Sequence, residues 1–581
     1  MADTRMGSAQ FGDYEGEDID RVFAGDLIGI GCNTNNKNKY YWFKPETHLT
    51  TVARTRSGKG ATLIIPNLLH YRGSTLVIDP KGENAYITAK RRRELGQKTY
   101  ILDPWGEVNR RYGSKSGEME EIATFNPLSL LDLESPDYMD DLAYIADSLI
   151  INQGKDPHWD DSARELVTGL ISYVMESIEE PSLYDVKTLL SKSIKEIAGI
   201  ATVAQELNSE EKDSLAARKL ARFIIATKEN ASILSTAQTQ TSILDNPALA
   251  ENMKTSSFSF DELTQGGEGV TIYLVLPVDK LQTYGRWLRL MISIGIRTIS
   301  RNTEKLDYPV LFILDEFGTI GKLSAVAQAV GLMAGLQVCL WLFLQDINQL
   351  KRDYPHEWET FIGNSGAVTV LDIMDNTTTR YFSEMLGTAT EERISETTAD
   401  IRKGNLFKSG NPDYMKMTDQ IFSRPLMTAD ELRAKPPALG ILIKNTFDPD
   451  LYERVPYFKN PFFYMKARQD PYHPDPRGDY EGLLADISNF TASLQKEEKF
   501  DVNLLITKGE ELIKKTSQKE KTQEEIRADF LELKSSYDKE KHKAQVAERI
   551  EIAKESTKKA FALGGQLFKK GKELLDKDEK S

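Results

Sequence analysis

The residues best suited to chemistry surround Lys59, in a turn that reads Thr-Arg-Ser-Gly-Lys-Gly from Thr55 to Gly60. One apolar run precedes this turn and another follows it, which is the pattern of a strand that leads through a phosphate-binding loop into a helix. In such a P-loop, backbone N–H groups surround the β-phosphate and the lysine reaches the β and γ oxygens. We therefore expect a nucleoside triphosphate to bind Thr55, Arg56, Ser57, Gly58, Lys59, Gly60 and Ala61.

This loop departs from the usual pattern G-x-x-x-x-G-K-[ST] at two positions. Ala53 replaces the first glycine, and Gly60 replaces the serine or threonine that would hold Mg²⁺. A Gly-Lys pair also occurs elsewhere, for example at Gly321-Lys322. Taken alone, the segment therefore fits a plain surface turn as well as it fits a P-loop.

A second stretch carries two adjacent carboxylates. The five apolar residues from Val310 to Leu314 lead into Asp315 and Glu316, as in a strand buried on both faces that delivers acids at its carboxyl end. In this Walker B pattern Asp315 would hold Mg²⁺ through water, and Glu316 would take the proton of the water that attacks the γ-phosphate. The alternative is an acidic helix start that caps the residues from Phe317 onward. The presence of both motifs favours a nucleotide site.

A glutamine follows the next apolar run. Gln345 comes directly after residues 337–344, at the carboxyl end of the strand that follows Walker B. There its amide would sense the γ-phosphate or orient the attacking water. The alternative is that Gln345 caps the turn that follows it.

The elements around these residues predict an α/β fold with a mostly parallel sheet. Strand-like runs alternate with helical spacing, and they occupy 26–43 (as a hairpin), 74–79, 99–103, 269–276, 337–344, 367–372 and 439–444. Helical patterns without a strand fill the region between the third run and the fourth. We expect a mobile acidic arm (1–24), the nucleotide-binding domain in two parts (25–150 and 259–480), an inserted all-α domain (151–258) and a C-terminal helical extension (481–581). Residues 388–418 are polar and predict a long surface loop.

Composition limits the class of protein. The chain has 581 residues, 40% hydrophobic and 28% charged, as in a soluble globular protein. Its net charge of −14 argues against a protein that coats nucleic acid. Cys32 and Cys339 lie far apart, which fits a reducing compartment. No apolar run approaches the roughly 20 residues that span a bilayer, so we expect a cytoplasmic protein without a transmembrane segment.

In this order, the motifs resemble those of the type IV coupling proteins of bacterial conjugation and type IV secretion, the TraG-like group of RecA-type hexameric ATPases. The similarity runs from about Gly25 to Phe463. It includes Thr55–Gly60, Asp79-Pro-Lys-Gly-Glu83, Phe125-Asn-Pro-Leu128, Asp156-Pro-His-Trp159, Ser162-Ala-Arg164, Leu314-Asp-Glu-Phe317, Gln345, Asp375, Tyr381–Gly387 and Arg424–Leu432. Gly-Lys-Gly at the P-loop is common in this group.

The resemblance implies a RecA-like motor that couples hydrolysis of ATP, with Mg²⁺, to delivery of relaxase-bound DNA or effector proteins to a type IV secretion channel. It implies a homo-hexamer, a position at the inner membrane, and an all-α domain that meets the substrate. Ring ATPases also need an arginine finger from a neighbouring subunit. The chain has no arginine from Phe317 to Lys351, so Arg286 and Arg289 are the candidates.

Three other functions stay open. A double-strand DNA translocase of the chromosome-segregation type would share the core but should carry a winged-helix domain, which the tail does not resemble. A ring scaffold that binds ATP without significant hydrolysis is the second alternative. A viral-type packaging motor is the third.

The tail carries an apolar stripe at helical spacing, flanked by lysines. Its members are Val546, Ile550, Ala553, Ala560, Leu567 and Leu574. The stripe predicts a helix that packs on its own chain or a helical neighbour, docks an adaptor protein, or lies at a membrane surface.

Overall fold

The computed structural model describes residues 8–12, 16–18, 25–36, 39–151, 157–208, 213–332, 335–396, 417–445, 447–464, 466–468, 480–494, 503–517 and 526–541. The chain forms two compact units, Met1–Pro471 and Tyr472–Ser581. The second unit thus begins a few residues before the predicted boundary at 481.

The main sheet of the first unit has 12 strands in the order β1-β3-β2-β14-β13-β10-β4-β9-β8-β5-β7-β6. Neighbours from β10 to β6 run parallel, and the pairs from β1 to β10 run antiparallel. The strands are β1 Glu17–Asp18, β2 Ile28–Asn33, β3 Lys39–Phe43, β4 His48–Ala53, β5 Thr75–Ile78, β6 Lys98–Leu102, β7 Val270–Leu274, β8 Val310–Leu314, β9 Val338–Leu344, β10 Ser365–Leu371, β13 Leu439–Lys444 and β14 Phe447–Glu453. The predicted hairpin and all six predicted strand runs are confirmed.

Both faces of the parallel part are buried, each in its own apolar core. Successive side chains of a strand point to opposite faces, so each strand contributes to both cores. On β8, Phe312 belongs to the core that holds helix α11 (Leu281–Arg301), whereas Ile313 belongs to the core that holds α1 (Ile65–Leu68) and α2 (Glu83–Glu94). Continuous apolar runs of this kind are typical of parallel strands covered on both faces.

Other helices complete this unit around the sheet. They are α3 Ser114–Ser116, α12 Ser324–Leu332, α13 Ile347–Asp353, α14 Trp358–Gly363, α15 Asn376–Met385, α16 Ala429–Ala434 and α17 Pro461–Tyr464. A π-helical segment, Gly60–Ile64, precedes α1 and carries the chain out of the predicted P-loop.

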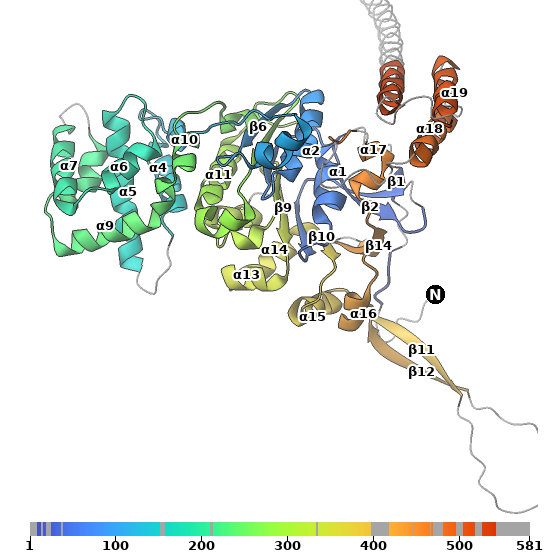
Figure 1. Ribbon diagram of the computed structural model, residues 1–581. Helices are drawn as coiled ribbons and strands as arrows, with labels where there is room; N and C mark the ends of the chain where they lie inside the picture. The colour runs from blue at the N-terminus through green and yellow to red at the C-terminus, as the bar shows by residue number, and fades with distance from the viewer. Residues whose placement is uncertain are drawn as a thin grey trace, which may run out of the picture. The chain divides into compact units, whose positions relative to one another are not determined.

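The described part of the predicted all-α domain (151–258) carries helices and no strand. It contains α5 Pro157–Ser177, α6 Leu183–Leu190, α7 Ile194–Glu206, α8 Leu215–Leu220, α9 Lys228–Gln240 and α10 Pro247–Asn252, and α4 Tyr138–Leu149 directly precedes it. Figure 1 shows α5, α6, α7 and α9 gathered as a block, with α4 and α10 on the side toward the sheet. The block is inserted between β6 and β7, as its place in the sequence predicts.

Two sequence expectations need correction. Residues 388–418 are not a long loop throughout, because β11 (Thr388–Glu396) and β12 (Met417–Pro425) pair antiparallel as a separate two-stranded sheet (Figure 1). The arm at 1–24 is attached in part: Ser8 bridges Ala389, and β1 pairs with β3. Both predictions were based on polar sequence, whereas the described parts of these segments are paired through backbone hydrogen bonds.

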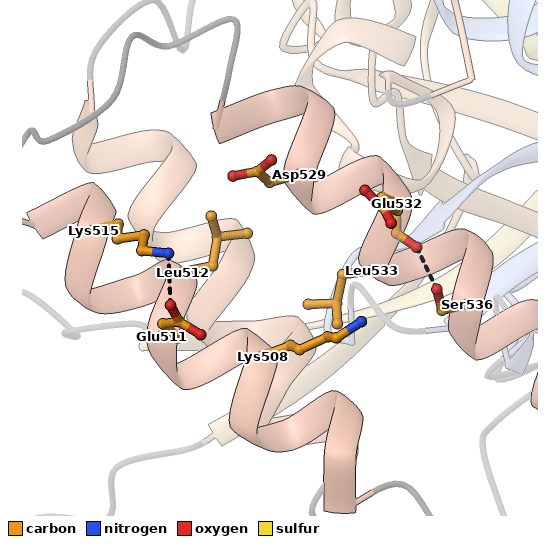
Figure 2. Close-up of a pocket in the computed structure, with 8 residues that line it drawn as sticks. All are labelled: Lys508, Glu511, Leu512, Lys515, Asp529, Glu532, Leu533 and Ser536. Carbon is orange, nitrogen blue, oxygen red and sulfur yellow. Dashed lines mark hydrogen bonds and ion pairs between the residues drawn. The ribbon is translucent and has the colours of Figure 1, made fainter.

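The second unit is helical where it is described, with α18 (Tyr480–Leu494), α19 (Asn503–Ser517) and a helix at residues 526–541. A groove of about 180 Å³ separates α19 from that last helix (Figure 2). Leu512 and Leu533 line it together with charged side chains, and none of the predicted site residues does. The stripe from Val546 to Leu574 lies outside the described residues. In the described part of the chain, no helix is long and apolar enough to span a membrane.

Candidate functional site

Strand order brings the predicted site residues together. The P-loop follows β4, Asp315 and Glu316 follow β8, and Gln345 follows β9, which lies between β4 and β8 in the sheet. All three strands run parallel, so their carboxyl ends share one edge. Ligands of open α/β sheets bind at this edge.

The loop from Thr55 to Gly60 turns sharply before the helix that follows it. Arg56 and Gly58 have φ values of 64° and 80°, so the chain turns through two left-handed residues before the helix begins. The first N–H groups of a helix have no partner within the helix, and they point toward the loop. A Cβ added at Gly60 would meet no atom within 4 Å, so packing does not require a glycine there.

Lys59 forms ion pairs with both Asp315 and Glu316. Its ammonium lies 2.7 Å from a carboxylate oxygen of Asp315 and 2.7 Å from one of Glu316. The second carboxylate oxygen of Glu316 accepts a 2.8 Å hydrogen bond from the Gln345 side-chain amide. The three charged side chains are only 12%, 14% and 18% exposed. The P-loop, Walker B and the glutamine therefore form one connected network.

The charges of this network affect one another. Burial raises the pKa of Asp315, in spite of the nearby ammonium. Burial acts in the same direction on Glu316, but the charge of Lys59 and hydrogen bonds from Lys59 and Gln345 outweigh it, so the pKa of Glu316 is lowered. Lys59 keeps a raised pKa because the two acids outweigh its burial. At neutral pH the ammonium is charged and Glu316 is an ionised base.

The structural alternatives for Glu316 and Gln345 do not fit this geometry. The Glu316 side chain makes no capping hydrogen bond to the short helix Phe317–Thr319. Helix α13 is capped by Asp346, whose carboxylate accepts from Gln349 N–H, and not by Gln345. Glu316 also has a φ of 55°, a conformation that few non-glycine residues adopt.

A further buried acid lies on the neighbouring strand. Asp79 follows β5, which pairs with β8, and its carboxylate accepts a 2.8 Å hydrogen bond from Ala85 N–H. Burial raises its pKa to about 7, with contributions from Glu83 and Asp315. Asp103 repeats this arrangement after β6, where its carboxylate accepts from Val108 N–H. These two acids shape the loops at the same edge of the sheet.

The proposed finger arginines lie elsewhere on the chain. Arg289 of α11 is 7% exposed and donates to the Lys322 carbonyl, and burial lowers its pKa to about 10. Arg286 donates to the carbonyl of Gln240, in the all-α region. The structure does not bring either side chain to the Lys59 network of the same chain. A finger acts on a neighbouring chain, so the assignment stays a prediction, and burial makes it less suited to Arg289.

Sequence reasoning missed one residue at this site. Arg454, which follows β14, donates a 2.7 Å hydrogen bond to the carbonyl of Ser57 in the P-loop. No motif marks it, because almost 400 residues separate donor and acceptor in the sequence. Only the order of strands in the sheet predicts that Arg454 lies beside Ser57.

The donor set fits Mg²⁺ and a nucleoside triphosphate. The loop supplies helix-start N–H groups and an ammonium for phosphates, and Asp315 supplies a buried carboxylate for the metal. The Ser57 hydroxyl is buried in this loop without a hydrogen-bond partner among the described residues. It is therefore available to bind a polar group of a ligand.

Comparison with known proteins identifies the family. A profile described as "Type IV secretory system Conjugative DNA transfer" matches residues 2–476, most of the chain. The chain belongs to this conjugative DNA-transfer family. Conjugal transfer protein TraG of Escherichia coli is 25% identical over 480 residues, which cover 76% of this chain and 72% of TraG. Protein VirD4 of Rhizobium rhizogenes is 23% identical over 450 residues, covering 75% of this chain and 62% of VirD4.

Solved structures support the fold of this family member. Plasmid coupling protein TrwB, in complex with a non-hydrolysable ATP analogue, matches with a TM-score of 0.51 at 15% identity, over 71% of this chain and 86% of TrwB. A TrwB complex with ADP and Mg²⁺ matches with a TM-score of 0.50 at 16% identity, over 71% and 85%. The conjugative DNA-transfer family member therefore has the RecA-like P-loop ATPase fold, as its motif order predicts.

Proposed function

We propose that this protein is an ATP-driven coupling protein that recruits relaxase-bound DNA or effector proteins and delivers them to a type IV secretion channel. The observation that carries the proposal is the network in which Lys59, Glu316 and Gln345 converge in a member of the conjugative DNA-transfer family. The related TrwB protein binds ADP with Mg²⁺ and an ATP analogue, which supports the choice of ligands.

Each residue has one task in the proposed hydrolysis. Lys59 would exchange its two carboxylate partners for β and γ phosphate oxygens, while backbone N–H groups from Thr55 to Ala61 surround the phosphates. Asp315 would hold Mg²⁺, which neutralises phosphate charge when bound. Glu316, released from Lys59, would accept the proton of the attacking water. Gln345, which donates a hydrogen bond to Glu316, would orient that water.

The proposed assembly is a homo-hexamer at the inner membrane, in which each nucleotide site needs an arginine from the next subunit. Reversing Arg286 to glutamate should cut turnover and leave nucleotide binding intact. The same change at the buried Arg289 should lower the melting temperature as well, so Arg286 gives the cleaner test. Unchanged turnover of the Arg286 variant would show that the arginine finger is another residue.

The proposed role of the tail is attachment to a partner. Flotation of residues 540–581 with anionic liposomes at low salt tests the membrane alternative. Loss of a co-purifying adaptor after deletion of these residues would favour docking instead.

A ring scaffold without hydrolysis is the second candidate function. The observation that favours it is Gly60, because the loop lacks the hydroxyl that usually holds Mg²⁺. The placement of Glu316 favours hydrolysis, since a scaffold has no need of an ionised base bonded to a glutamine amide.

The experiment that tests the coupling role is capture of cargo from cells. Glu316→Gln should bind ATP without turnover and enrich relaxase-bound DNA or effector proteins, whereas Lys59→Ala should not. Glu304→Gln, an exposed acid before β8, is the matched control and should behave as the wild type. Equal recovery of cargo by all the variants would contradict a nucleotide-dependent coupling protein.

A further inference from the structure

The carbonyl of Ser57 accepts a hydrogen bond from a buried arginine that follows β14, a strand separated from β4 by β13 and β10. The Arg454 guanidinium donates at 2.7 Å to that carbonyl and at 3.0 Å to the carboxylate of Asp372. Its side chain is 6% exposed. Asp372 follows β10, the strand that pairs with β4 directly before the P-loop. A single side chain therefore ties the P-loop to the next strand.

We propose that Arg454, oriented by Asp372, is a positioning residue that holds the P-loop in its phosphate-binding conformation. The proposal rests on the nucleotide site proposed above and adds a determinant of its affinity. Arg454 would act through the backbone of Ser57 and would not contact the nucleotide.

Peptide geometry explains how a carbonyl contact controls the loop. In a planar trans peptide, the C=O of one residue and the N–H of the next point in opposite directions. When Arg454 holds the Ser57 carbonyl, it therefore also fixes the direction of the Gly58 N–H, which belongs to the phosphate-binding segment. Arg56 and Gly58 are both left-handed, a conformation that needs outside support when a non-glycine residue adopts it.

The surroundings of Arg454 supply positive charge beside the loop. Asp372 pairs with Arg454 and lies 3.9 Å from the Lys435 ammonium, so one carboxylate faces two cations. Lys435 and Asp372 side chains are 3% and 11% exposed. The excess cation is thus buried, where solvent screens it weakly, next to the segment that would receive an anion.

The strand pairing of the local backbone does not depend on the Arg454 side chain. The backbone of Arg454 is already fixed, because its N–H donates to the Ala438 carbonyl at 2.8 Å and β14 pairs with β13 and β2. A buried ion pair contributes little net stability compared with apolar side chains of similar volume. Stability alone would therefore favour apolar side chains in place of the Arg454–Asp372 pair, whereas a role in the nucleotide site accounts for the charges.

The test compares Arg454→Met, Arg454→Lys and Asp372→Asn in the full chain, with Arg433→Met as the matched control. Arg433 also donates to a backbone carbonyl, that of Met374, but it has no contact with the P-loop among the described residues. Fluorescent ATP-analogue titration gives Kd, steady-state hydrolysis gives kcat and KM, and thermal unfolding without nucleotide reports on folding.

Arg454→Met should raise Kd and KM by about 10- to 100-fold, the range for one hydrogen bond to a charged group. kcat at saturating ATP should change far less, because the nucleotide restores the loop. Arg454→Lys should bind ATP more tightly than Arg454→Met, since lysine keeps the charge. It should bind less tightly than the wild type, since lysine lacks the planar guanidinium that donates to two acceptors at once. The double variant with Asp372→Asn should lose less affinity than the sum of the single losses. Arg433→Met should match the wild type.

Wild-type affinity in Arg454→Met would overturn the proposal while leaving the nucleotide site in place. If Arg454→Met does not fold, the proposal is tested with Arg454→Lys and Asp372→Asn. Wild-type Kd values for ATP in both variants would overturn the proposal. Failure of the wild type itself to bind ATP would contradict the proposed function and not this assignment alone.

Discussion

Replacing Lys59 by methionine should destabilise the nucleotide-free protein, and most strongly at alkaline pH. The ammonium lies 2.7 Å from both Asp315 and Glu316, and its removal leaves two adjacent, largely buried carboxylates without it. Removing one partner of a fully buried ion pair costs about 3–5 kcal/mol. Because these side chains keep some solvent contact and can take up a proton, we expect about 2 kcal/mol. In a folded unit of this size that lowers the melting temperature by about 2 °C.

The pH dependence gives this prediction its sign. In the wild type, the lowered pKa of Glu316 contributes stability above the unfolded-state pKa, and that stability is lost as the pH falls. In Lys59→Met, burial and mutual repulsion raise the pKa of both acids above their unfolded values. The variant therefore loses stability as the pH rises through that interval, and its deficit is larger at pH 8 than at pH 5.

Thermal unfolding of the nucleotide-free protein at the two pH values is the assay. Lys305→Met is the matched control, because Lys305 is an exposed lysine before β8. The double variant Lys59→Met/Asp315→Asn should recover most of the loss by removing one of the two negative charges. A Lys59→Met protein as stable as the wild type at pH 8, or equally destabilised at both values, would refute the account of this network.

Three further predictions concern single side chains of the site. Gln345→Ala should lower kcat about 10- to 100-fold with little change in the Kd for ATP, as expected for loss of a water-orienting group, and a wild-type kcat would exclude that role. Asp79 has a pKa of about 7, so folding loses up to about 4 kcal/mol as the pH rises from 4 to 7, and Asp79→Asn should flatten the melting temperature across that interval. A slope as steep as that of the wild type would show that Asp79 is not its source. Gly60→Ser should keep the melting temperature and lower the Mg²⁺ concentration needed for hydrolysis, because the site has room for the hydroxyl; a folded variant with no change in Mg²⁺ dependence would indicate that this position does not face the metal.

Features that depend on local pattern could be predicted from the sequence. The apolar run from Val310 to Leu314 predicts β8 and the acids at its end, since a strand buried on both faces needs continuous apolar residues. The turn Thr55–Gly60, together with these acids, predicts the P-loop. Because the carboxyl ends of parallel strands share one edge of a sheet, Lys59, Glu316 and Gln345 are expected at the same edge. The structure shows them in direct contact there.

Features that depend on distant pairing could not be predicted. Nothing near Arg454 marks it as a partner of Ser57, because the contact exists only once β14 and β10 have taken their places in the sheet. The strands β11 and β12 carry few apolar residues, so their pairing leaves no periodic signal.

The most direct test of the central claim, that Glu316 is the catalytic base of an ATPase, is single-turnover hydrolysis by Glu316→Gln at saturating ATP and Mg²⁺. Glutamine keeps the size of the side chain but cannot accept the proton, so hydrolysis should slow by about 100- to 10,000-fold while the Kd for ATP stays within a few-fold of the wild-type value. Hydrolysis at the wild-type rate, with ATP bound equally well, would contradict the claim.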